Sequence, residues 1–266
     1  MKYEIFDQSD VFSIETTVRL EDLRKMTLKF SKVIDLDAFI QKTRTLGGKT
    51  IDLRDTLKAV LLGNSITVVS DMDIKLKSTK SHPLFQGSDF KVISLRGVDF
   101  YVKSEGTDMF SQCHAEEIIL PSKSKVNLKS TSGMFYRCRR LKKLNIENLY
   151  TQKIKDMSRM FQEVWNIESL DLSNFDTSNV VSMEYMFYTS KFKDLDVSKF
   201  NTSKVTNMHG MFSHLTLEGT LDLSNFDMSN VVNRTLMLYK TEATKIIYGD
   251  VVTPDNNSAL RTTLIN

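Results

Sequence analysis

The chain has 266 residues, 41% of them hydrophobic and 26% charged, with a net charge of +3. This composition is ordinary for a folded, water-soluble protein, and two Cys residues are too few for a disulfide framework. No run of 18 apolar residues and no leader-like start is present, so we expect neither a membrane span nor a signal peptide.

The first segment, residues 1–55, does not share the periodicity of the rest of the chain. Within it, the stretch from Asp35 to Leu46 predicts a helix that ends at Gly47 and Gly48, because glycine commonly terminates helices. The alternating run Ile66–Val69 in the next segment predicts a strand of a degenerate repeat. We therefore predict an N-terminal cap over 1–55, a repeat region over 56–240 and a C-terminal cap over 241–266.

A Met-Phe pair recurs along the repeat region with nearly constant spacing. The pairs, with two conservative variants at the ends, begin at Leu84, Met109, Met134, Met160, Met186, Met211 and Met237. The steps between them are 25, 25, 26, 26, 25 and 26 residues. A fixed period of this length is the signature of a solenoid, in which each unit buries its apolar face only against its neighbours.

Each repeat carries two further patterns. The alternation in Leu170-Asp171-Leu172, repeated at 221–223, predicts a half-buried strand. Four residues before each of the last five pairs stands a residue type that caps helices; these are Ser130, Asp156, Ser182, Asn207 and Asn233. Together with apolar residues at helical spacing, this column predicts a short helix in every repeat. We therefore expect an α/β solenoid of about seven strand-turn-short-helix coils.

The segment LDLSNFDTSNVVSMEYMF (170–187) resembles the repeats of BspA-like leucine-rich-repeat proteins. The same pattern returns as LDVSKFNTSKVTNMHGMF (195–212) and, less completely, as LDLSNFDMSNVVN (221–233). The resemblance covers residues 130–238 and implies a leucine-rich-repeat solenoid of bacterial type that binds proteins. It provides no catalytic residue.

The residues capable of chemistry form no recognisable catalytic or metal-binding motif. The four His residues stand at different positions of the repeat, and the chain has no phosphate-binding glycine loop, CxxC or HExxH. Cys113 and Cys138 share one column of adjacent coils; a disulfide is sterically allowed there, but two small packed core residues are the favoured interpretation. We predict a protein that is not an enzyme and uses no metal or cofactor.

One stretch is strongly basic. Residues 123–159 hold eleven Lys or Arg residues against Glu147 and Asp156, a local charge of +9. The residues predicted to contact a partner are Lys123, Lys125, Arg137, Arg139, Arg140, Lys142 and Lys143. Either a binding patch or a solvated edge explains this excess, and the sequence does not decide between them.

These features lead to three functional hypotheses. The first is an interaction scaffold that binds or inhibits a partner macromolecule, most plausibly an acidic protein surface, as a mobile-element or host-interaction factor. The second is a bacterial surface adhesin or a fragment of one. The third is a nucleic-acid-associated protein that uses the basic patch, whose binding would fall steeply with salt. We expect a cytoplasmic location for the sequence as written, and the cell surface or secretion if an export signal has been removed.

Overall fold

The computed structural model describes the side chains of residues 83, 85–88, 90–95, 106–121, 128 and 130–249. It also describes the backbone of the flanking strands named below. The predicted helix at 35–46 and the residues Lys123 and Lys125 lie outside this part of the chain.

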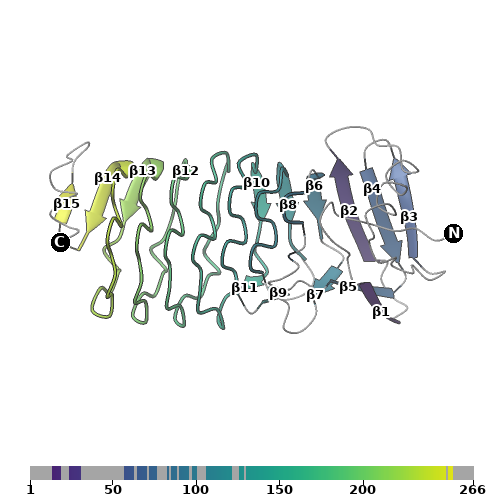
Figure 1. Cartoon of the computed structure of the whole chain (residues 1–266), viewed down its shortest axis with the longest axis horizontal. Helices are drawn as coiled ribbons and strands as arrows, with labels where there is room; N and C mark the ends of the chain where they lie inside the picture. Colours follow the sequence, from purple (N-terminus) through teal and green to yellow (C-terminus); the bar gives the residue numbers. More distant parts are fainter. Residues whose placement is uncertain are drawn as a thin grey trace.

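The repeat region is a β-solenoid whose coils stack along the long axis of the molecule (Figure 1). One side is built from the strands β6 (Phe90–Ser94), β8 (Glu117–Ile119), β10 (Lys143–Asn145), β12 (Lys191–Phe192), β13 (Thr216–Asp222) and β14 (Glu242–Tyr248). The pairs β6–β8, β8–β10, β12–β13 and β13–β14 are all parallel. A second parallel pair joins β9 (Val126–Asn127) to β11 (Leu149–Tyr150).

Antiparallel strands pair with both ends of this ladder. At one end β2 (Arg24–Phe30) pairs with β6 and with β4 (Ser65–Ser70), and β4 pairs with β3 (Leu57–Leu62). Nearby, β5 (Met72–Leu76) pairs with β1 (Ile14–Val18) antiparallel and with β7 (Val98–Phe100) in parallel. At the other end β15 (Val251–Thr253) runs antiparallel to β14. The predicted strand at Ile66–Val69 is confirmed, because it lies within β4. The predicted domain limits stay predictions.

The predicted short helices are absent from the described residues, so the α/β leucine-rich-repeat fold is wrong. Six-residue turns stand in their place, hereafter called the turn segments: 107–112, 132–137, 158–163, 184–189, 209–214 and 235–240. Two residues of each turn segment have a left-handed backbone, such as Arg159 (φ 58°) and Glu163 (φ 57°). A right-handed helix cannot continue through such residues.

The hydrogen bonds of a turn segment explain why no helix forms. The N–H groups of Arg159, Phe161 and Glu163 donate to carbonyl groups of the next coil, each at 2.9 Å. Between them, the N–H groups of Met160 and Gln162 donate to carbonyl groups three residues back, at 3.3 and 3.2 Å. An α-helix instead bonds every N–H to the carbonyl four residues back. Alternate N–H groups therefore join neighbouring coils rather than close a helix.

The column interpreted as helix caps does bind backbone, but in a different way. Asp156 Oδ1 accepts a hydrogen bond from Ser158 N at 2.9 Å, and Asn207 Oδ1 accepts one from His209 N at 3.0 Å. These bonds to the residue two positions later form Asx turns. The same residues also form parallel bridges from coil to coil, Asp156 to Ser182 and Asn207 to Asn233. These side chains do accept hydrogen bonds from backbone N–H groups, as predicted, but the bonds form turns within a coil instead of starting a helix.

The core consists of columns of identical residues stacked along the solenoid. Phe85, Phe110, Phe135, Phe161, Phe187 and Phe212 are each 0% exposed. Successive rings are 5.3, 5.5, 5.6, 5.7 and 5.6 Å apart between centroids and lie within 13° of parallel. Such aromatic pairs stabilise a fold by about 0.5–1.5 kcal/mol beyond the burial of their area. The predicted stacking of the Met-Phe pairs is confirmed.

We predict that Phe161→Ala destabilises the solenoid by about 3–5 kcal/mol, because it opens a cavity in the middle of the stack. Phe161→Leu should cost clearly less, since Leu238 fills the same column in the last coil and is 2% exposed. Urea unfolding followed by circular dichroism measures both changes. Val232→Ala, at a side chain that is 88% exposed, is the control. Equal losses for Phe161→Ala and Val232→Ala would contradict a core built on this stack.

Candidate binding surface

The described part of the predicted basic cluster runs from the last residue of the turn segment 132–137 to the first residue of strand β10 (Lys143–Asn145). Its five described members, Arg137, Arg139, Arg140, Lys142 and Lys143, are all exposed. The coil architecture therefore gathers these five side chains at one edge of one coil.

One acidic residue of the next coil, Glu163, pairs with the two arginines that flank Cys138. Arg137 Nε lies 3.0 Å from Glu163 Oε1, and the guanidinium of Arg139 binds Glu163 Oε2. The Arg139 guanidinium also lies 4.6 Å from the centroid of the Trp165 ring. Burial raises the pKa of the Glu163 carboxyl, but hydrogen bonds and charge from Arg139 and Arg137 lower it by more, so its pKa is below the ordinary value.

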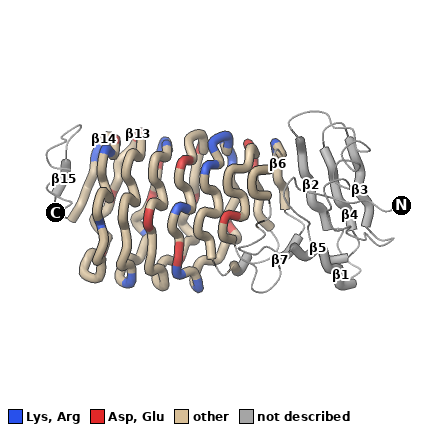
Figure 2. The backbone as a smooth tube through the Cα atoms, in the orientation of Figure 1, with Lys and Arg blue, Asp and Glu red and all other residues tan. Residues whose placement is uncertain are grey.

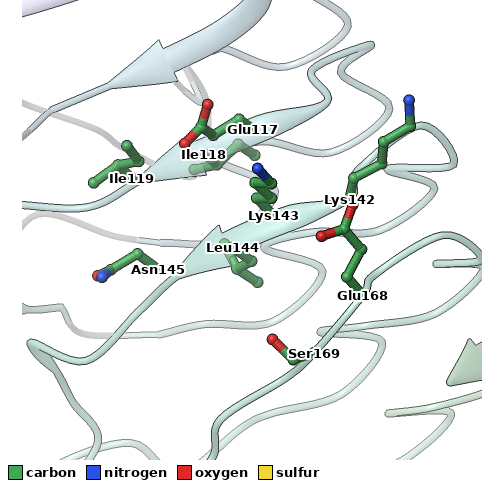
Figure 3. Close-up of a pocket in the computed structure, with 9 residues that line it drawn as sticks. All are labelled: Glu117, Ile118, Ile119, Lys142, Lys143, Leu144, Asn145, Glu168 and Ser169. Atoms are coloured by element: carbon green, nitrogen blue, oxygen red, sulfur yellow. The ribbon is translucent and has the colours of Figure 1, made fainter. Parts of the chain in front are cut away.

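Acidic residues of the preceding coil face the two lysines. Lys142 Nζ lies 3.0 Å from Glu116 Oε2, and its hydrogen bond is the main cause that lowers the pKa of Glu116. Lys143 is the register neighbour of Glu117 on the parallel strand β8. Figure 3 shows Lys142, Lys143 and Glu117 around one hollow, together with Glu168 of the following coil.

The basic stretch therefore does not form a purely basic patch. Its excess of +9 counts charges along the chain, whereas the surface is formed by residues about 25 positions apart. Basic and acidic residues alternate across neighbouring coils in this region (Figure 2). Among the described members, Arg137, Arg139 and Lys142 form ion pairs, whereas Arg140 and Lys143 do not. The role of these residues in partner binding stays a prediction.

The last three turn segments carry a row of aromatic and histidine side chains that was not predicted from the sequence. This row, called the aromatic strip, consists of Tyr185, Tyr188, His209, His214 and Tyr239. Its rings meet edge to face, with centroids 5.1 Å apart for Tyr185–Tyr188 and 4.9 Å for Tyr185–His209. His214 lies between Tyr188 and Tyr239, at 5.8 and 5.4 Å. The strip thus crosses three coils without interruption.

Local contacts hold the strip in place. The Tyr185 hydroxyl and His209 Nε2 are 2.7 Å apart, and the Arg159 guanidinium lies 5.8 Å from the Tyr185 ring centroid. Gly210 leaves space for the ring of Tyr185, because a Cβ atom at this position would stand 2.5 Å from a ring carbon. These contacts restrict the rotation of the rings in the strip.

Three buried polar atoms on the turn segments have no hydrogen-bond partner. They are Ser111 Oγ, Gln162 Oε1 and His209 Nδ1. An unpaired buried polar atom costs about 1–3 kcal/mol, so each one calls for an explanation. All three lie on the turn segments, the side of the solenoid that carries the aromatic strip.

The two Cys residues lie in adjacent coils of the core. Cys113 and Cys138 are free and buried, with sulfur atoms 3.7 Å apart, and burial raises the pKa of the Cys138 thiol. The described part of the chain contains no cluster of three or more His, Cys, Asp or Glu residues suited to a metal ion. Nor does that part contain a helix able to cross a membrane.

Comparison with known proteins identifies one similarity. Residues 129–249 match the family model described as Mycoplasma protein of unknown function, DUF285. This match covers 121 of the 266 residues. No curated protein and no solved structure matches the chain. The resemblance to BspA-like leucine-rich repeats is therefore wrong, since the repeats match a different family model and form a β-solenoid.

We predict that Glu163→Gln destabilises the protein by about 1–2 kcal/mol at pH 7, because it weakens the charge-assisted bonds to Arg137 and Arg139. The lowered pKa of Glu163 means that its carboxylate stabilises the fold above the unfolded-state pKa of about 4.3. This contribution is lost as the pH falls through the lower folded-state pKa. Urea unfolding between pH 7 and pH 3 measures the free energy of unfolding of both proteins. The difference between wild type and Glu163→Gln should become smaller as the pH falls.

The exposed Glu168 of the same coil provides the control. Glu168→Gln should change the free energy of unfolding little at any of these pH values, because surface carboxylates contribute little to stability. A difference between wild type and Glu163→Gln that stays constant from pH 7 to pH 3 would contradict the role of the Glu163 carboxylate.

Proposed function

We propose that the chain is a non-enzymatic scaffold that binds another protein through the aromatic strip. The observation that carries this proposal is a preorganised row of Tyr and His rings on an outward face of three stacked coils. Tyrosine combines a large apolar ring with a polar tip and is enriched at protein interfaces and in binding hot spots. Tyr239 and the neighbouring Leu236 are 42% and 40% exposed, so apolar surface remains available there.

The basic cluster is a second proposed contact, for an acidic surface on the same or another partner. The strip is preferred because Arg137, Arg139 and Lys142 already bind carboxylates within the chain. The same ion pairs argue against the nucleic-acid hypothesis, because they reduce the charge available to phosphate groups. An adhesin would use the strip in the same way, since the chemistry of contact does not depend on the compartment.

The test compares wild type with the double variant Tyr188→Ser, Tyr239→Ser. Each protein is immobilised and exposed to lysate of the organism that encodes the chain, and captured proteins are quantified by mass spectrometry. We expect a protein retained by wild type to be lost by the double variant. With that protein purified, calorimetry should show affinity reduced at least about tenfold, since two hot-spot tyrosines are removed.

Val232→Ser is the matched control, because it also removes exposed apolar surface but lies outside the strip. Its affinity for the purified partner should equal that of wild type. The proposal fails if the double variant binds the partner as tightly as wild type does, or if Val232→Ser weakens binding to the same extent.

A further inference from the structure

A polar groove lies on the same side of the solenoid as the aromatic strip, over the preceding coils. It has a volume of about 680 Å³ and is lined by residues of four turn segments, from Thr107 to Glu184. Its far wall adjoins the strip, because Arg159 lines the groove and also packs on the Tyr185 ring. The inference below rests on the proposed function and concerns the chemistry of the partner.

The lining restricts the class of ligand. Its members are nearly all Ser, Thr, Gln or charged residues, and Tyr136 provides the aromatic ring among them. Three carboxylates, Asp108, Asp156 and Glu184, stand against one cation, Arg159, so the lining carries a net charge of −2. A groove of this kind repels phosphates and offers little to an apolar chain, whereas it favours a cationic ligand with hydrogen-bonding groups.

Two of the carboxylates, those of Asp156 and Glu184, have hydrogen-bond acceptor positions left for a ligand. Asp156 uses Oδ1 to accept from Ser158 N, and Glu184 uses Oε2 to accept from Asn207 Nδ2 at 3.3 Å. Neither forms an ion pair with any residue that the structure describes. A carboxylate has about four acceptor positions, so each retains room for an ammonium or guanidinium donor.

An independent observation also indicates a ligand. Ser111 lines the groove and is 1% exposed, yet its Oγ has no hydrogen-bond partner. A buried hydroxyl in a polar wall without a partner is unfavourable unless a bound molecule completes its bonding. Ser111 is therefore suited to bind a backbone amide or carbonyl group of a segment that occupies the groove.

We propose that the groove binds an extended segment of the partner protein that carries at least two Lys or Arg residues. The lining runs from Gln86 to Glu184 and so crosses five successive coils, which are stacked at intervals of about 4.8 Å. Four such intervals span about 19 Å, the length of roughly six residues of extended chain. Asp156 and Glu184 take the basic side chains, while the hydroxyl and amide groups between them bind the backbone of the segment.

The first experiment uses a fluorescein-labelled eight-residue peptide of alternating lysine and serine, with its glutamate–serine counterpart. Fluorescence anisotropy should show wild type binding the lysine peptide and not the glutamate peptide. The double variant Asp156→Asn, Glu184→Gln should weaken binding of the lysine peptide at least about tenfold. Asn at position 156 preserves the turn, because Asn207 and Asn233 occupy the same column in later coils.

The control variant Glu168→Gln, Asp171→Asn removes the same charge from another side of the solenoid. It should bind the lysine peptide as wild type does. Equal weakening by both double variants means that only general attraction to negative charge is at work, and this result would overturn the proposal. Equal binding of the two peptides by wild type would overturn it as well.

The purified partner separates this inference from the proposed function. Asp156→Asn, Glu184→Gln should weaken partner binding about tenfold. If it leaves the affinity unchanged while Tyr188→Ser, Tyr239→Ser abolishes binding, the groove proposal fails and the scaffold function stands. If neither variant affects the partner, the proposed function itself fails. Self-association of wild type that the groove variant abolishes would identify a second copy of the chain as the occupant and overturn the proposal.

Discussion

The stack depends on the hydrogen bonds that pass from each turn segment to the next coil. Three N–H groups in a segment such as 158–163 leave their own coil and bind carbonyl groups of the following one. Because these bonds occur at the same positions in successive coils, they fix the register of the whole ladder. The Phe rings then fall directly over one another, at 5.3–5.7 Å between centroids, without any helix to align them.

The left-handed residues make this arrangement possible at a conformational cost. Most of them are not glycine; Arg159, Tyr185 and His214 are examples. A left-handed backbone costs roughly 1–2 kcal/mol for such residues, so it persists only where the surroundings compensate. The inter-coil bonds and the buried Met-Phe columns provide that compensation. A residue held in this way presents its side chain in a fixed direction, which makes the turn segments suitable for a preorganised binding surface.

The repeat, its period and its buried columns could be predicted from the sequence, because apolar residues at fixed spacing need no knowledge of the backbone. The secondary structure of the turn segments could not. Asp156 and Asn207 have the side chains of helix caps, but the same oxygen atoms serve equally well in Asx turns. A helix cap and an Asx turn differ in the backbone that follows, which here includes left-handed residues such as Arg159 and Glu163. The amino-acid types of these residues do not indicate a left-handed backbone. The alternation of Leu170, Asp171 and Leu172 predicted burial correctly, since both Leu side chains are buried and Asp171 is exposed. It did not predict secondary structure, because no strand covers these three residues, whereas β13 covers the equivalent Leu221 and Asp222.

The binding surface was harder to predict for a related reason. In a solenoid, surface neighbours are separated by a full coil, so charge counted along the chain misrepresents the charge of the surface. Glu163 binds both Arg137 and Arg139 from 26 and 24 residues away and lowers their combined charge from +2 to +1. The rings of the aromatic strip come from four different positions of the repeat: counted from the repeat Met, Tyr185 stands one residue before, His209 two before, Tyr188 and Tyr239 two after, and His214 three after. No single column of the sequence therefore predicts the strip. The interior columns repeat because the stack requires it, whereas the positions that form the strip differ from coil to coil and can encode recognition.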